Sequence, residues 1–129
     1  RTQHRILDKV TKSMEIAPEK ISFNAMDEQI LKKAISIVER NLDNSDFSTE
    51  VFAAEMNMSR SNLHIKLKAL TGESALDFIR KIRFKEACRL LKDGRHSIAE
   101  ISDMVGFNTQ KYFSKYFKEM FGMTPSQFR

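Results

Sequence analysis

Apolar and polar residues alternate along this chain with the period of an α-helix, most clearly in the stretch GFNTQKYFSKYFKEMFG at residues 106–122. Its aromatic residues and one methionine recur at i, i+1, i+4 and i+5, which predicts a single apolar helix face. The residues assigned to that face are Phe107, Tyr112, Phe113, Tyr116, Phe117, Met120 and Phe121. A second face carries lysines at i, i+4 and i+7, namely Lys111, Lys115 and Lys118. Thr109 as N-cap and Gly122 as C-terminal stop predict a helix of about three turns.

The same pattern occurs a second time, earlier in the chain. Setting Ser48 against Ser97 aligns residues 52–58 with residues 101–107 at an offset of 49, and one extra residue in the second copy then makes the offset 50. The pairs at the second offset are Ser59 with Thr109, Leu63 with Phe113, Leu67 with Phe117, Lys68 with Lys118, Gly72 with Gly122, Ser74 with Thr124 and Phe78 with Phe128. An internal repeat of this length indicates that the architecture is duplicated.

Each copy predicts a short helix, a tight turn and a longer helix. Ser48 caps the first short helix, and Ser97 with Glu100 forms a capping box for the second. Asn57 and Gly106, residue types that tolerate a left-handed backbone, are expected at the two turns. A second capping residue then opens a longer helix that ends at glycine. This is the helix-turn-helix layout, in which the second helix can enter the major groove of DNA.

A long helix is predicted between the copies, at residues 74–94, with Ser74 as its N-cap, Asp77 in its first turn and Gly94 as its stop. The apolar residues expected to face the core are Leu76, Ile79, Ile82, Ala87, Leu90 and Leu91. The basic residues expected near phosphates or on the solvated rear are Arg80, Lys81, Arg83, Lys85 and Arg89. About 20 residues span about 30 Å, which is close to the ~34 Å between successive major-groove segments. Such a helix could hold the two helix-turn-helix motifs one turn of the DNA duplex apart.

Composition supports an all-α fold, because the chain has only 4 Gly and 2 Pro and few runs of β-branched residues. We expect about seven helices in two homeodomain-like helix-turn-helix subdomains, at residues 27–73 and 95–129, joined by the linker helix at 74–94. Residues 1–26 form a linker or N-terminal extension, in which Ile6, Leu7, Val10 and Met14 predict either a short amphipathic helix or part of a disordered tail. No apolar run approaches the ~20 residues needed to span a bilayer. The polar start without an initiator Met suggests a piece of a longer protein.

The charge distribution indicates an anionic partner. The net charge is +5, and it is uneven: residues 27–58 carry three basic and seven acidic side chains, whereas residues 59–95 carry ten basic and four acidic ones. The positive field therefore lies in the middle of the chain. The single cysteine, Cys88, excludes an internal disulfide and is expected to be buried, in keeping with a reducing compartment.

No pattern of enzyme chemistry is present in the sequence. Nothing resembles a nucleophile with its base, a phosphate-binding glycine loop or a pair of catalytic carboxylates. His4 and His96 have no partners at metal-ligand spacing. We therefore expect no catalytic residues, no metal and no cofactor.

The C-terminal string IAEISDMVGFNTQKYFSKYFKEMFGMTPSQFR resembles the signature of the AraC/XylS family of bacterial transcription regulators. The matching positions are Gly106, Phe107, Phe113, Phe117, Lys118, Gly122, Thr124, Pro125, Phe128 and Arg129. The segments SRSNLHIKLKALTG and DEQILKKAISIVERNLDNSDFS are similar to output domains of Bacteroidetes hybrid two-component sensors. The resemblance covers about residues 27–129.

That resemblance implies a cytoplasmic, double-stranded DNA-binding activator, either on its own or as the cytoplasmic part of an inner-membrane hybrid sensor. Implied partners are direct-repeat or paired operator sites, RNA polymerase, and the receiver and kinase domains of a parent chain that acts as a dimer. In such proteins the controlled genes are often those of polysaccharide utilisation.

The resemblance also places the DNA contacts. Candidates for base contact are Gln110, Lys111, Ser114, Lys115, Arg60, Ser61, His64 and Ile65. Candidates for phosphate contact are Lys66, Lys68, Lys118, Ser59 and Thr109, and Arg60 suits either role. The family often has arginine where this chain has Ile65. Because isoleucine cannot donate a hydrogen bond to guanine, Ile65 would contact a thymine methyl group or simply pack.

Two other functions fit the same residues. A nonspecific architectural or RNA-binding protein would bind by charge alone, whereas specific binding survives competitor DNA. A helical protein-interaction module would ignore duplexes even at low salt.

Overall fold

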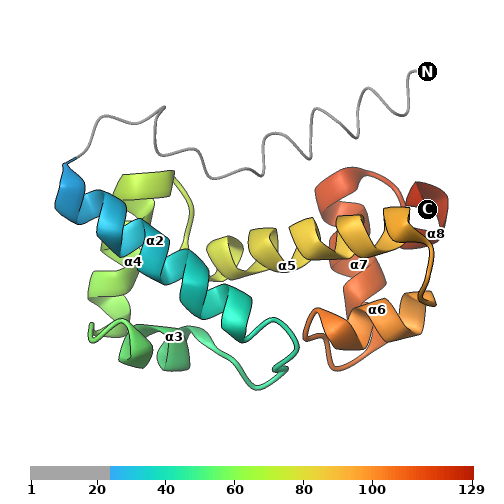
Figure 1. Cartoon of the computed structure of the whole chain (residues 1–129), viewed down its shortest axis with the longest axis horizontal. Coiled ribbons are helices and arrows are strands. Elements are labelled where there is room, and N and C mark those ends of the chain that lie inside the picture. Colours follow the sequence, from blue (N-terminus) through green and yellow to red (C-terminus); the bar gives the residue numbers. More distant parts are fainter. Residues whose placement is uncertain (1–23) are drawn as a thin grey trace. The chain divides into compact units, whose positions relative to one another are not determined.

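The structure is a computed structural model that describes residues 24–129, so the amphipathic helix predicted within residues 1–26 lies outside the described residues. Residues 24–129 contain seven helices and no strand, which confirms the predicted all-α fold (Figure 1). The helices are α2 (Ala25–Arg40), α3 (Thr49–Glu55), α4 (Arg60–Thr71), α5 (Ala75–Asp93), α6 (Ile98–Met104), α7 (Gln110–Phe121) and α8 (Pro125–Phe128). None of the helices in this range is long and apolar enough to cross a membrane.

Local sequence signals set the ends of these helices. Ser59 and Thr109 each accept a hydrogen bond from a backbone N–H in the first turn of α4 and α7, and Ser97 with Glu100 forms a complete capping box on α6. Gly72 and Gly122 end α4 and α7 in the left-handed conformation, at φ 78° and 75°. These caps and stops confirm the predictions, because each depends on residues only a few positions apart.

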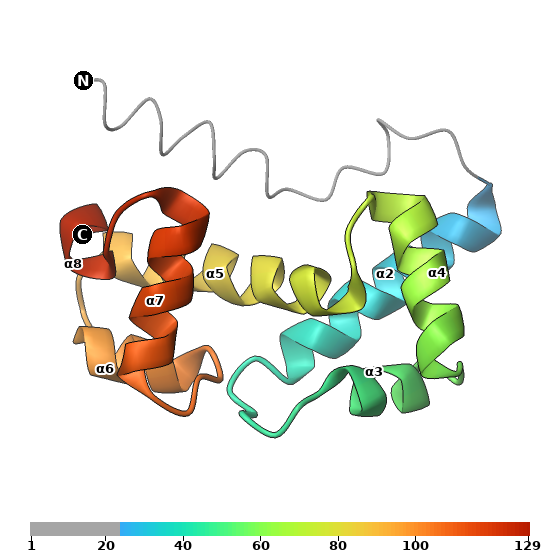
Figure 2. The same cartoon turned by 180° about the vertical axis from the view of Figure 1, so that it is seen from behind.

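The described chain forms two compact units. The N-terminal unit comprises residues 24–41 and 46–82, and the C-terminal unit comprises residues 42–45 and 83–129. Each unit holds one helix-turn-helix motif: α3 and α4 in the first, α6 and α7 in the second (Figure 2). Helix α5 is continuous and supplies residues to both cores, its first part to the N-terminal unit and its second part to the C-terminal unit.

Aromatic side chains organise both cores. In the N-terminal unit Phe52 of α3 stacks on Phe78 of α5, with ring centroids 5.9 Å apart. In the C-terminal unit Phe84 of α5 is fully buried, and its ring lies 5.3–6.2 Å from four other phenylalanine rings. Those four are Phe107, Phe113, Phe117 and Phe121. Burying a side chain of this size contributes roughly 1.5–3 kcal/mol. The sequence-based list of inward-facing residues on this helix had left out Phe84.

The turns of the two motifs have matching backbone conformation and matching hydrogen bonds. Asn57 and Gly106 both have positive φ, 58° and 83°. After the turn the N–H of Met58 donates to the carbonyl of Ala53, and the matched N–H of Phe107 donates to the carbonyl of Ser102, each at 3.0 Å. The repeat in the sequence is therefore also a repeat of backbone conformation.

Four predicted positions differ in the structure. Tyr112 is 51% exposed rather than part of the buried face, and Phe107 lies in the turn before α7 rather than on the helix. Leu76 is 48% exposed, because the buried stripe at this end of α5 is formed by its neighbours Ala75, Phe78, Ile79 and Ile82. Arg83 was expected near phosphates or on a solvated rear, yet it is buried.

Candidate nucleic-acid interface

Helix α4 has one apolar and one polar face. Leu63, Leu67 and Leu70 are buried in the N-terminal unit. The predicted contact residues that lie exposed are Ser59, Arg60, Ser61, His64, Ile65 and Lys68, whereas Lys66 is partly buried. The structure thus leaves all the predicted residues of the first motif except Lys66 exposed to solvent.

Two of the cations on α4 have acidic partners. The Lys66 ammonium lies 2.7 Å from a carboxylate oxygen of Asp27 in α2, and the Arg60 guanidinium lies 2.9 Å from Glu50 in α3. An exposed pair such as Arg60 with Glu50 contributes at most about 1 kcal/mol and exchanges readily for another anion. The ion pair of Lys66 with Asp27 exchanges less readily for another anion, because the Asp27 side chain is largely buried. Lys68 therefore offers a phosphate more net positive charge than Lys66 does.

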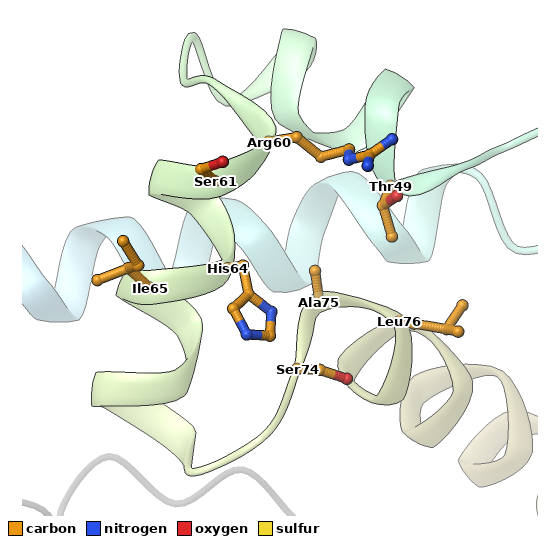
Figure 3. A pocket seen from close by; sticks show the side chains of 8 residues that line it. All are labelled: Thr49, Arg60, Ser61, His64, Ile65, Ser74, Ala75 and Leu76. Carbon is orange, nitrogen blue, oxygen red and sulfur yellow. The ribbon is translucent and has the colours of Figure 1, made fainter.

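A hollow of about 400 Å³ lies beside this face of α4. Four predicted residues line it: Arg60, Ser61, His64 and Ile65. The other lining residues were not predicted; they are Thr49 at the start of α3 and Ser74, Ala75 and Leu76 at the start of α5. Figure 3 shows the His64 ring between α4 and Ser74, with Ile65 and Leu76 toward opposite sides. No sequence signal on α4 itself could reveal walls contributed by two other helices.

Helix α7 likewise has one apolar and one polar face. Phe113, Phe117 and Phe121 are buried, while the predicted residues Thr109, Gln110, Lys111, Lys115 and Lys118 are exposed and Ser114 is partly buried. Within residues 24–129 none of these three lysines forms an ion pair.

Two tyrosines flank the lysines of α7. The rings of Tyr112 and Tyr116 stack 6.5 Å apart, and the Lys115 ammonium lies 5.6 Å from the Tyr116 ring centroid. A cation over an exposed aromatic ring gains only about 0.5–1 kcal/mol. This contact therefore leaves Lys115 able to reach a stronger acceptor. Neither tyrosine was among the predicted contact residues.

Arg83 supports the turn of the second motif from within the C-terminal unit. Its guanidinium donates to the carbonyl of Gly106 at 3.2 Å and to the carbonyl of Asn44 at 2.9 Å. Burial lowers the pKa of Arg83 from its ordinary value. Because the side chain is 8% exposed and both its terminal nitrogens bind backbone, Arg83 is a structural residue rather than a phosphate contact.

Gly106 is packed closely against the same groups. A Cβ atom at this position would lie 2.4 Å from the Leu42 carbonyl oxygen and 2.9 Å from Cζ of Arg83. The turn that precedes α7 is therefore fixed both by its left-handed backbone and by its surroundings.

Glu100 and Cys88, also in the C-terminal unit, have shifted pKa values. A hydrogen bond from the backbone N–H of Ser97 holds the pKa of Glu100 below its ordinary value. Burial raises the pKa of the Cys88 thiol to about 12, and the positive charge of Lys92 acts in the opposite direction. Cys88 is thus a buried apolar side chain, as predicted.

Comparison with known proteins agrees with this fold. Residues 52–129 match the family described as helix-turn-helix domain. Over 125 residues the chain is 42% identical to histidine kinase P4 of Formosa agariphila, a match that covers 97% of this chain but 9% of that protein. The chain therefore spans less than a tenth of this much longer relative.

Three solved structures have a closely similar fold. One is the C-terminal domain of AraT, a response regulator from Geobacillus stearothermophilus (34% identity, TM-score 0.72, 78% of this chain and 83% of that chain). Another is a transcriptional regulator with an AraC-type DNA-binding domain from Chromobacterium violaceum (28% identity, TM-score 0.72, 82% of this chain and 94% of that chain). The third is the DNA-binding domain of AdpA in complex with a target DNA (26% identity, TM-score 0.70, 76% of this chain and 87% of that chain).

A duplicated helix-turn-helix with two exposed second helices defines a DNA-binding domain of a transcription regulator. This chain belongs to the AraC-type helix-turn-helix family, and it is related to domains of a response regulator and of a histidine kinase.

Proposed function

We propose that the chain binds double-stranded DNA in a sequence-specific manner, with α4 and α7 as its recognition helices. The observation that carries this proposal is the exposed face of α7. Lys111, Lys115 and Lys118 lie opposite a fully apolar buried face and are free of carboxylate partners within the described residues. Helix α4 presents the matched face in the first motif.

The side chains suggest a division of roles. Lys111 and Lys115 can donate to the O6 and N7 atoms of guanine, and Gln110 can pair with adenine. Lys68 and Lys118, one turn further along their helices, supply charge to phosphates without reading sequence. Lys66 contributes less, because Asp27 already neutralises it.

The duplication of the motif suggests that both copies are used. We propose that α4 and α7 enter successive major grooves of one duplex, which lie about 34 Å apart.

The relationship to histidine kinase P4 and to AraT suggests that this domain is the output of a two-component signalling protein. In that setting receiver and kinase domains of the same chain would control dimerisation on direct-repeat or paired operator sites. Activation through RNA polymerase, and a cytoplasmic location, follow from the same proposal. Control of polysaccharide-utilisation genes stays a prediction that rests on resemblance alone.

Selection of bound duplexes from a random pool, followed by binding measurements across salt concentration with competitor DNA, tests the proposal. We expect a recovered motif in which single base changes cost about 1–3 kcal/mol. A charge-only binder would give no motif, and an interaction module would not bind duplexes at all. Either result would refute sequence-specific recognition.

Two lysine variants test the division of roles. Lys115→Ala should weaken binding and relax sequence preference at one or two positions. Lys68→Ala should weaken binding to all sequences alike and reduce the magnitude of the salt slope by about 1. Lys33→Ala, an exposed lysine of α2, is the control. Equal effects of the first two variants on every sequence would contradict these roles.

A further inference from the structure

The two recognition helices differ at several matched positions, and at one of them an exposed apolar side chain of α4 faces a cation of α7 in the alignment. At the offset of 50, Ile65 of α4 corresponds to Lys115 of α7, and Ser61 corresponds to Lys111. Lys68 and Lys118, by contrast, are the same residue at matched positions. The two helices therefore share the lysine proposed to contact phosphate, but they differ at the positions proposed to contact bases.

Ile65 has no role in the core of its unit. Its side chain is 64% exposed, whereas the other large aliphatic side chains of α4, Leu63, Leu67 and Leu70, are 0–4% exposed. It lies on the same face as Ser61 and Lys68 and lines the 400 Å³ hollow. Figure 3 shows it projecting outward from α4. An apolar side chain in this position can be covered only by something that approaches the reading face.

Only one base offers an apolar group in the major groove. Guanine, adenine and cytosine present donors and acceptors there, and thymine adds the 5-methyl group. Isoleucine, which has no donor or acceptor, can recognise that methyl group and nothing else on a base edge. Lys115, a donor, suits the O6 and N7 acceptors of guanine instead.

We infer that the two half-sites differ in composition: Ile65 contacts the 5-methyl group of a thymine beneath α4, whereas Lys115 contacts a guanine beneath α7. This inference rests on the proposed function and deepens it, because it assigns a base to each recognition helix. An operator of this kind has two chemically different halves and so a direction.

Replacing thymidine with 2′-deoxyuridine removes the methyl group and leaves base pairing unchanged. Burial of one methyl group corresponds to about a fourfold change in affinity. Each thymidine of the duplex recovered by selection is replaced in turn, and binding to the purified chain is measured. We expect one position at which uracil weakens binding about fourfold.

Two alanine variants identify the side chain responsible. Ile65→Ala should bind the thymine and uracil duplexes equally, because the partner of the methyl group is gone. Leu76→Ala, a matched control that removes the other exposed aliphatic side chain of the hollow, should keep the fourfold difference. Both residues are solvent-facing, so both variants should fold, which far-UV circular dichroism checks.

A third variant tests the matched pair directly. Ile65→Lys copies the α7 residue into α4, and a repeated selection should recover guanine where the wild-type chain selects thymine. In parallel, replacing guanine with 7-deazaguanine in the other half-site should weaken DNA binding by the wild-type chain but not by Lys115→Ala.

Each outcome supports or overturns one claim. If no motif is selected, the proposed function itself fails. If a motif is selected but uracil is tolerated at every position, or the uracil effect persists in Ile65→Ala, the inference fails while the proposed function stands. Loss of the effect in Leu76→Ala alone would reassign the methyl contact to Leu76 and overturn the role of Ile65.

Discussion

Replacement of Gly106 with alanine should be far more damaging than the same change at Gly122, although both glycines lie in the C-terminal unit with similar backbone conformation. Their φ angles are 83° and 75°. A Cβ atom on Gly122 would meet nothing within 4 Å, whereas a Cβ atom on Gly106 would lie 2.4 Å from the carbonyl oxygen of Leu42. The pair therefore separates the cost of a left-handed backbone from the cost of a steric clash.

The magnitudes follow from the contacts. A left-handed conformation costs a non-glycine residue roughly 1–2 kcal/mol, and this alone applies to Gly122→Ala. In Gly106→Ala the Leu42 carbonyl or the Arg83 guanidinium must also move, which endangers the hydrogen bonds of Arg83 to the carbonyls of Gly106 and Asn44. A hydrogen bond with a charged donor contributes about 1.5–3 kcal/mol. Together these two contributions lead us to expect that Gly106→Ala destabilises the fold by about 2.5–5 kcal/mol.

Urea unfolding followed by far-UV circular dichroism measures both variants, and the free energy of unfolding should differ between them by about 1.5–3 kcal/mol. Asn57 occupies the position matched to Gly106 in the first motif at φ 58°, so a side chain at this turn is not forbidden by the backbone alone. Equal destabilisation by the two alanine variants would show that the contact with Leu42 and Arg83 has no energetic consequence, and the reasoning would be refuted.

Three further predictions concern ionisable groups. The pKa of Glu100 is lowered by the backbone N–H of Ser97. The ionised carboxylate therefore stabilises the fold above the ordinary pKa of a glutamate, and this stabilisation is lost as the pH falls through the folded-state pKa. Urea midpoints across acidic pH should fall less in Glu100→Gln than in the wild type. With its pKa raised to about 12 by burial, the Cys88 thiol should react with alkylating reagents much more slowly in the folded chain than in urea, and equal rates would contradict its burial. Asp27→Asn should release Lys66 and strengthen binding to all duplexes by up to about fivefold at low salt, whereas an unchanged affinity would mean that Lys66 does not reach DNA.

The sequence was most informative where structure depends on neighbours in the chain. The capping box of Ser97 and Glu100 and the glycine stops were predicted correctly, because each is decided within a single turn of helix. The internal repeat also predicted the duplicated architecture, because positions that match in the two copies are expected to adopt the same conformation. Asn57 and Gly106 do so.

Prediction failed where burial depends on distant partners. The carbonyls that bind Arg83 belong to residues 23 and 39 positions away, and nothing in the basic pattern of α5 separates Arg83 from its exposed neighbour Lys85. Helical spacing likewise assigned Leu76 and Tyr112 to apolar faces without showing where the neighbouring helices stop covering them. The hollow beside α4 was missed for the same reason, because three helices build it.

The placement of Tyr112 and Tyr116 has a practical consequence for spectroscopy. The chain contains two tyrosines and no tryptophan, and both tyrosines stand on α7. Its tyrosine emission therefore originates from a single helix, without any engineered label. Quenching of that emission on titration with a duplex would report occupancy of α7 alone, so the second motif can be followed separately from the first in the unmodified protein.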